Sequence, residues 1–148
     1  MEYHLSIGVF GTGEDPQHRS HWGFVIHHPT CLIGDLLHVE LLDLDTLWYE
    51  FEMRFKTDLA IRGAQGLSRI TTLDPLQRNK AIEVIKSEPA PRDGQRRCQD
   101  WVFSTLIALE VEELVPPGTT EFWKGMIALP AREVRRARWD RWTSLINV

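Results

Sequence analysis

The chain has 148 residues, of which 43% are hydrophobic and 26% charged, and its formal net charge at neutral pH is −4. This length and composition predict one soluble globular domain over residues 1–148, with enough apolar side chains for a core of its own. The acidic balance argues against a general nucleic-acid-binding surface, which is basic. No uninterrupted apolar run approaches the ~20 residues of a membrane span, so we expect no transmembrane segment.

The chain has two cysteines, Cys31 and Cys98. Two are too few for a disulfide framework, and too few for a structural zinc site unless histidines join them. The N-terminus, MEYHLSIGVFGTGEDP, has neither the basic start nor the long apolar stretch of a secretory signal peptide. We therefore expect a reducing, cytoplasmic location in which both thiols stay free.

The first half of the chain has the patterns of β-strands. Residues 3–10 (YHLSIGVF) lead into a turn-rich segment. The runs 21–28 (HWGFVIHH) and 32–42 (LIGDLLHVELL) are separated by Pro-Thr-Cys, which favours a hairpin. Residues 48–56 alternate aromatic and charged side chains, as a half-buried strand does, and residues 68–73 are a shorter candidate.

The second half has the patterns of helices. Asp74 is a typical N-cap before Pro75 and predicts a helix over residues 75–87. The next helix is expected to begin at Cys98 and to end near Leu114, before a Pro-Pro-Gly stretch. Further helices are expected over residues 121–129 and 131–146. Strands followed by helices predict an α+β domain, a mainly antiparallel sheet packed against the helix headed by Cys98 and additional C-terminal helices.

Cys98 has the position of a nucleophile at a helix N-terminus. It shares a helical stripe with Val102 and Leu106, so its thiol is expected to point toward the sheet. Unpaired N–H groups and the helix dipole favour a thiolate there, as do the neighbouring Arg96 and Arg97. The same N–H groups can hold an oxyanion. The alternative is an inert cysteine that only packs in the core.

A nucleophile also needs a base, and histidines are concentrated in the predicted hairpin. A turn centred between the two strands places His21 opposite Glu40, and His38 one pair further along the same face. We expect this to be the face toward which Cys98 points, with His21 as base and His38 as the residue that orients it. His28 and Glu40 are the alternatives for the third residue.

A metal site is a second interpretation of the histidines. Adjacent His27 and His28 project to opposite faces of a strand, however, and cannot easily share one ion. We therefore expect no metal and no other cofactor.

The C-terminal run is rich in arginine and tryptophan. A basic amphipathic helix here either packs on the core, with arginine stems covering its edges, or presents a surface to an anionic substrate or a membrane. The arginines concerned are Arg132, Arg135, Arg136, Arg138 and Arg141.

The order of these motifs resembles the circularly permuted papain-like families, the NlpC-type and lecithin:retinol acyltransferase-like thiol enzymes. A histidine that opens a strand as HWGFVI, a polar residue on the next strand and a cysteine that heads a later helix stand where these families have His-Trp-Ala-like and Asn-Cys-Glu-His-Phe-like motifs. RCQDWV is also similar to the NCQDWV of small fungal proteins. The resemblance covers about residues 20–42 and 95–115; Arg97 replaces asparagine, and Gln99 replaces the glutamate of the acyltransferases.

The resemblance implies a circularly permuted papain-like fold and a cysteine-dependent hydrolase or acyltransferase. Its substrate would be an amide or ester in a small molecule or peptide. Cys98 would be the nucleophile, His21 the general base and His38 the orienting residue. The oxyanion and substrate-binding positions would be Gln99, Arg97 and Trp22. The alternatives are a non-catalytic small-molecule or protein-binding module with the same fold, and self-association through tryptophans.

Overall fold

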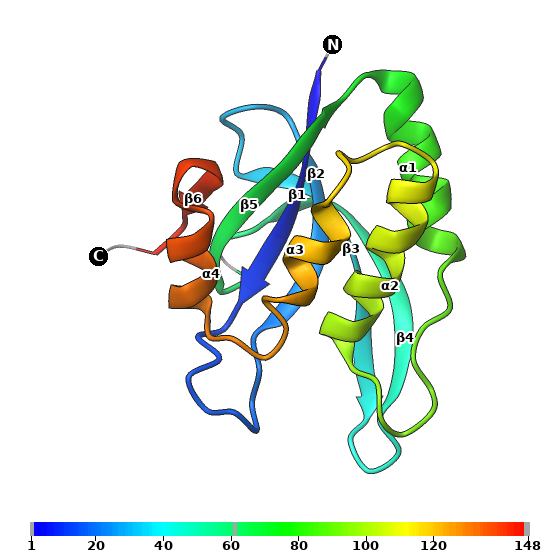
Figure 1. Ribbon diagram of the computed structural model, residues 1–148, viewed down its shortest axis with the longest axis vertical. Helices are drawn as coiled ribbons and strands as arrows, with labels where there is room; N and C mark the ends of the chain where they lie inside the picture. Colours follow the sequence, from blue (N-terminus) through cyan, green and yellow to red (C-terminus); the bar gives the residue numbers. More distant parts are fainter. Residues whose placement is uncertain (1, 61, 147–148) are drawn as a thin grey trace.

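The computed structural model describes residues 2–60 and 62–146 and is an α+β structure (Figure 1). The described residues form an antiparallel sheet with the strand order β4-β3-β2-β1-β5-β6. The strands are β1 (Tyr3–Phe10), β2 (His21–His27), β3 (Ile33–Asp43), β4 (Trp48–Asp58), β5 (Ala64–Leu73) and β6 (Trp142–Ser144). The helices are α1 (Pro75–Ser87), α2 (Cys98–Val111), α3 (Thr119–Lys124), α4 (Ala131–Ala137) and the short 3-10 helix η1 (Trp139–Arg141). The predicted α+β class and mainly antiparallel sheet are confirmed.

The β2–β3 hairpin has the register that the sequence analysis assumed. Phe24 pairs with Leu37 and Ile26 with Asp35. Continued by one residue, this register sets Gly23 beside His38, and a Cβ on Gly23 would lie only 2.9 Å from the Cβ of His38. A glycine at this position therefore lets the two strands approach closely where His38 projects.

Strand alternation divides the sheet into two apolar faces. Trp22 and Phe24 of β2 belong to a large core with Val102 and Leu106 of α2. In Figure 1 the helices α1, α2 and α3 cover this face. A smaller cluster, on the opposite face, consists of Val25, Leu36, Leu59, Ala64 and Leu67.

The start of α1 follows the predicted capping. The carboxylate of Asp74 accepts a hydrogen bond from the backbone N–H of Gln77 at 2.7 Å, and the side-chain oxygen of Gln77 accepts one from the Asp74 N–H at 2.9 Å. Both partners satisfy N–H groups that a helix start leaves unpaired. Among the described residues, no helix combines the length and the apolar composition that crossing a bilayer requires.

The prediction of a continuous C-terminal helix over residues 131–146 is wrong. Helix α4 ends at Ala137, and β6 pairs with the outer edge of β5. The ring of Trp142 lies over Gly66, where a Cβ would come within 2.2 Å of it. Pairing with β6 gives hydrogen-bond partners to backbone groups at the edge of β5 and covers the ring of Trp142. A helix over these residues would provide neither. The preceding helix α3 is also shorter than predicted and ends before Gly125.

The buried stripe of α2 is expected to contribute to the stability of the fold. Leu106 has no exposed surface, whereas its neighbour Ile107 is 45% exposed. Leu106→Ala should lower the free energy of unfolding by about 2–5 kcal/mol, because it removes buried methyl groups and leaves a cavity. Ile107→Ala is the matched control and should cost less than about 1 kcal/mol. Urea denaturation of both variants measures this; equal losses would contradict the assignment of the buried stripe.

Candidate active site

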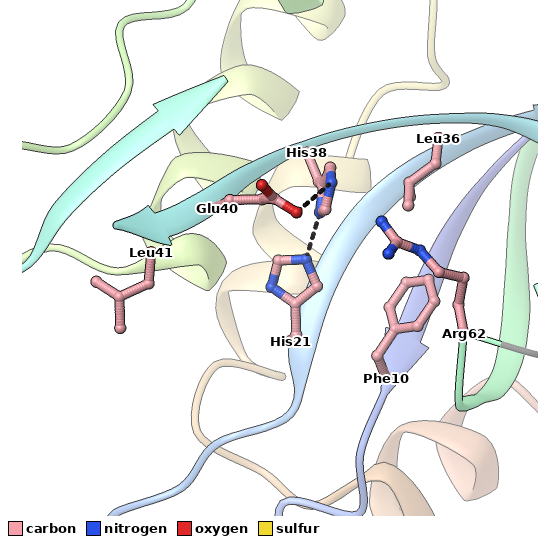
Figure 2. A pocket seen from close by; sticks show the side chains of 7 residues that line it. All are labelled: Phe10, His21, Leu36, His38, Glu40, Leu41 and Arg62. Atoms are coloured by element: carbon pink, nitrogen blue, oxygen red, sulfur yellow. Dashed lines mark hydrogen bonds and ion pairs between the residues drawn. The ribbon is translucent and has the colours of Figure 1, made fainter. Parts of the chain in front are cut away.

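Three side chains from neighbouring strands form a chain of hydrogen bonds on the face of the sheet opposite helices α1, α2 and α3. The Nε2 atom of His21 lies 2.8 Å from Nδ1 of His38, and Nε2 of His38 lies 3.0 Å from Oε1 of Glu52. His21 opens β2, His38 lies in the middle of β3, and Glu52 pairs with His38 across the β3–β4 ladder. Figure 2 shows the rings of His21 and His38 in contact, with Glu40 beside them.

Glu52 is held as a carboxylate. A hydrogen bond from Arg54 is the main reason that its pKa falls to about 2, and the hydrogen bond from His38 lowers it further. A guanidinium nitrogen of Arg62 lies 3.6 Å from the same carboxylate oxygen. At neutral pH Glu52 is therefore ionised and can only accept hydrogen bonds.

This carboxylate determines where the protons of both imidazoles lie. Because Glu52 only accepts, the Nε2 atom of His38 must carry a proton, and Nδ1 of a neutral His38 is left as an acceptor. His21 must then donate from Nε2 to His38. The Nδ1 atom of His21, which has no hydrogen-bond partner among the described residues, keeps its lone pair. His21 is thereby set up as a base.

His21 is neutral at physiological pH. Burial, followed by the neighbouring His38 and Arg62, lowers its pKa from 6.5 to about 4. The imidazole therefore has a free lone pair at neutral pH, and it becomes cationic only when it takes a proton from a reaction partner.

Helix α2 packs on the opposite face of the sheet from the histidines. The expectation that Cys98 points at the face bearing His21 and His38 is wrong in this respect, because α2 covers the face of Trp22. Cys98 nevertheless lies at the N-terminal end of α2, where the backbone N–H of Trp22 is near enough to its sulfur to lower the pKa of the thiol. Since Trp22 directly follows His21, the sulfur lies beside the peptide bond that joins these two residues.

The thiol of Cys98 is not the acidic thiol that the sequence predicts. Burial raises its pKa above the ordinary value, and hydrogen bonds from the N–H groups of Trp22 and Gln99 oppose this effect only in part. Arg96 is engaged with Asp93 at 2.9 Å, which removes one of the expected cations. The resting pair at neutral pH is therefore a thiol and a neutral imidazole, with no preformed ion pair.

Donors for an oxyanion lie around the sulfur. The N–H groups of Cys98 and Gln99 are in the first turn of α2, where no intrahelical acceptor is available, and both act to lower the pKa of the thiol. The phenol of Tyr49, on β4, lies near the N–H of Cys98, which acts to lower its pKa. Burial and the neighbouring Cys98 raise the pKa of Tyr49, so its O–H stays protonated and remains a donor.

The side chains of Gln99 and Trp22 have structural roles. The buried amide of Gln99 donates to the backbone oxygen of Ser20 at 2.9 Å and accepts from the N–H of Ala128 at 2.8 Å. The Trp22 ring is fully buried and meets Trp123 edge to face at 5.2 Å. The side chains of Gln99 and Trp22 are therefore engaged within the protein, and oxyanion or substrate binding at these two positions, through their backbone N–H groups, stays a prediction.

Arg97 contributes its backbone to the start of α2. Its N–H donates to the carboxylate of Asp100 at 2.8 Å, which caps the helix in place of the usual side-chain cap. Its side chain is partly exposed at the helix start, beside Tyr49, whose pKa it acts to lower. A contact of this guanidinium with a substrate stays a prediction.

The remaining candidates for the third residue lie further away. Glu40 comes within 3.8 Å of Nε2 of His38, behind Glu52 in the same chain. His28 follows the other end of β2, where it stacks on Tyr3 at 4.6 Å. His38 is thus the only one of the three that contacts the ring of His21 in the described part of the chain.

A hollow of about 420 Å³ opens at the histidines (Figure 2). Apolar side chains form part of its wall, and Glu40 and Arg62 supply opposite charges. Its lining residues are Phe10, His21, Leu36, His38, Glu40, Leu41 and Arg62. Such a mixed wall suits a small organic molecule or a peptide side chain.

A group of metal-ligand type also lies here. His38, Glu40 and Glu52 bring ligand atoms within 4.8 Å of one another. The positive groups of Arg54 and Arg62 already neutralise Glu52, which disfavours a further cation. We therefore assign the three side chains to hydrogen bonding.

Glu52 and Tyr49, both on β4, were not predicted from the sequence. The signal available was the alternation in residues 48–56, which places Glu50, Glu52 and Arg54 on one strand face. Alternation does not predict how β4 is aligned with β3, so it could not identify the residue that pairs with His38.

The low pKa of His21 makes stability depend on pH. Between pH 6.5 and about 4 the unfolded chain binds a proton at His21 that the folded chain excludes, so stability falls as the pH drops through this window. The free energy of unfolding falls by about 3 kcal/mol over the whole window. Above pH 6.5 this effect is absent, because His21 is neutral in both the folded and the unfolded chain. In His21→Gln the free energy of unfolding should fall less over this window than in the wild-type protein.

Urea denaturation at a series of pH values measures the effect. His18→Gln, which alters an exposed histidine, is the matched control and should keep the wild-type dependence. Identical pH profiles for the His21 variant and the wild-type protein would show that His21 titrates normally.

Comparison with known proteins adds no family to this site. No protein-family model matches the chain, and no curated protein and no solved structure matches it. The resemblance to permuted papain-like enzymes therefore stays a prediction from motifs.

Proposed function

We propose that this chain is a cysteine-dependent hydrolase or acyltransferase that acts on an amide or ester, with a permuted papain-like fold and a cytoplasmic location. The observation that supports this most is the chain of hydrogen bonds from His21 through His38 to Glu52. It leaves the lone pair on Nδ1 of His21, and the sulfur of Cys98 lies near the N–H of Trp22, the next residue along β2. Both cysteines are free thiols, which fits a reducing setting.

The first step forms an acyl-enzyme. The step requires the ring of His21, the first residue of β2, to reach the sulfur of Cys98 around the end of that strand. Nδ1 of His21 then takes the thiol proton as the sulfur attacks the carbonyl carbon of the substrate. The oxyanion accepts hydrogen bonds from the N–H groups at Cys98 and Gln99 and from the O–H of Tyr49. The cationic His21 is stabilised through His38 by the negative charge of Glu52. It then protonates the leaving amine or alcohol, and the C–N or C–O bond breaks.

The second step regenerates the thiol. His21 removes a proton from the incoming water, amine or alcohol, whose oxygen or nitrogen attacks the thioester carbonyl. The C–S bond breaks, and His21 returns the proton to the sulfur. With water the result is hydrolysis; with an amine or alcohol it is acyl transfer. The hollow beside His21, with Arg62 and Glu40 in its wall, is the proposed place for the substrate group next to the reacting carbonyl.

The proposal predicts a covalent acyl intermediate at Cys98. Incubation with p-nitrophenyl acetate should release p-nitrophenol in a burst equal to the enzyme concentration, and mass spectrometry should find one acetyl group on the peptide that contains Cys98. Cys98→Ala should abolish the burst. His21→Gln should slow it about 10²–10⁴-fold, because the general base is lost.

Cys31→Ala is the matched control, since Cys31 is the other free cysteine and lies at the opposite end of the hairpin. It should keep the wild-type burst. Acetylation that persists in Cys98→Ala, or that is equal at both cysteines, would overturn the proposal. Specific binding of small molecules in the hollow without any burst would instead identify a non-catalytic binding module.

Glu52 is proposed as a positioning residue that fixes the proton arrangement. Glu52→Gln should lower the rate of acylation by about 10²-fold or more, because an amide no longer forces the proton onto Nε2 of His38. The imidazole ¹⁵N shifts should report the cause directly. In the wild-type protein they should show a proton on Nε2 of His21, and in the variant a mixture of tautomers.

Glu50→Gln removes the same charge from an exposed position on the same strand and is the matched control. It should leave both the rate and the ¹⁵N shifts unchanged. An unchanged tautomer in Glu52→Gln would refute the positioning role, even if the rate falls through a loss of stability.

A further inference from the structure

A second, separate hollow lies between β5 and the segment that leads into α3. It has a volume of about 690 Å³, and no acidic side chain lines it. Three arginines face it, from β5, from the end of α4 and from η1. Its lining residues are Arg69, Ile70, Thr71, Thr72, Pro116, Pro117, Gly118, Thr119, Phe122, Arg138 and Arg141. We call it the arginine groove.

Arg138 is the fixed member of this cluster. Its side chain is only 9% exposed, and its guanidinium donates to the hydroxyl of Ser68 at 2.8 Å and to the backbone oxygen of Arg69. The same group lies over the ring of Phe122, 5.0 Å from its centre. These contacts hold the guanidinium in one orientation, and none of them neutralises its charge.

The positive charge of the groove is poorly compensated. Among the residues that the structure describes, Arg69, Arg138 and Arg141 form no ion pair with a carboxylate. Burial, Arg141 and Arg69 together lower the pKa of Arg138 to about 10, while Asp140 acts in the opposite direction. Asp140 does not line the groove but lines the neighbouring hollow, which Arg69 and Arg141 also border. The net charge of the chain is −4, so the three arginines without ion pairs make this groove a positive site on an acidic protein.

We propose that the arginine groove binds the phosphate group of a phosphorylated ligand. Guanidinium groups match the geometry of phosphate oxygens through paired N–H donors, and several of them suit a group with more than one negative charge. Thr71 and Thr72 of β5 also line the groove, and a threonine hydroxyl on the groove side is an additional donor. The groove lies apart from the residues that surround His21, so this binding does not depend on the proposed acyl chemistry.

The test is calorimetric titration of the full chain with inorganic pyrophosphate at constant ionic strength. Saturable binding is expected in the wild-type protein. The double variant Arg69→Gln/Arg141→Gln should bind at least 10-fold more weakly. Arg132→Gln/Arg136→Gln is the matched control, because it removes the same charge from exposed, ion-paired positions on α4, and it should change the affinity less than 2-fold.

A parallel assay distinguishes a soluble ligand from a lipid headgroup. Phosphatidylcholine vesicles with and without phosphatidate are sedimented with the same proteins. Pyrophosphate binding without sedimentation assigns a soluble phosphorylated molecule, whereas sedimentation that needs phosphatidate and Arg69 and Arg141 assigns a lipid headgroup. The proposal is overturned if neither probe binds, or if the groove variant and its control weaken binding equally. The p-nitrophenyl acetate burst, measured on the same variants, is expected to be unchanged and separates failure here from failure of the acyl chemistry.

Discussion

The hydrogen bond between the carboxylate of Glu52 and Nε2 of His38 is the interaction on which the candidate site depends. Hydrogen bonds from Arg54 and, to a lesser extent, His38 keep this carboxylate ionised, so it can only accept hydrogen bonds. That single constraint gives the hydrogen-bond chain a direction, from His21 toward β4, and leaves the outer nitrogen of His21 as a base. With a neutral acid or an amide at position 52, either tautomer of His38 would be satisfied, and His21 would lose its defined role.

Burial explains why the resting site is neutral. Burial removes water from around both groups and disfavours their charged forms. It therefore raises the pKa of the Cys98 thiol and lowers the pKa of the His21 imidazole. A positive charge on His21 is therefore costly except while a negative charge forms close by. The ionised Glu52, two hydrogen bonds away, lowers that cost without moving, and the N–H groups at the start of α2 do the same for the negative partner. Charge separation is thus confined to the reacting complex.

The sequence predicts the parts of the site that follow from local rules. Turn residues and alternation give the β2–β3 hairpin and its register, which bring His21 to His38, and capping preferences give the start of α1. Glu52 could not be found in this way, because the β3–β4 ladder contains two register shifts, and each one exchanges the faces of the residues beyond it. The strand β6 was missed for a related reason: its partner Gly66 is distant in sequence, and helical periodicity in residues 131–146 says nothing about it. Alternation also defines two strand faces without saying which one a helix covers, although the apolar set of Trp22, Phe24 and Ile26 pointed to the observed face.

The arginine groove and the histidine chain illustrate two ways of keeping charge in a partly buried place. At Glu52 the charge is matched by cations on the same protein, so the site is complete without a ligand. At Arg138 the guanidinium is anchored by a hydroxyl, a backbone oxygen and an aromatic ring, which orient the group but leave its charge unmatched. Burial of an unpaired charge is unfavourable, and an apolar side chain of similar size would fill this space at lower cost. A guanidinium that is oriented but not neutralised is therefore best explained by an anion that arrives from outside the chain.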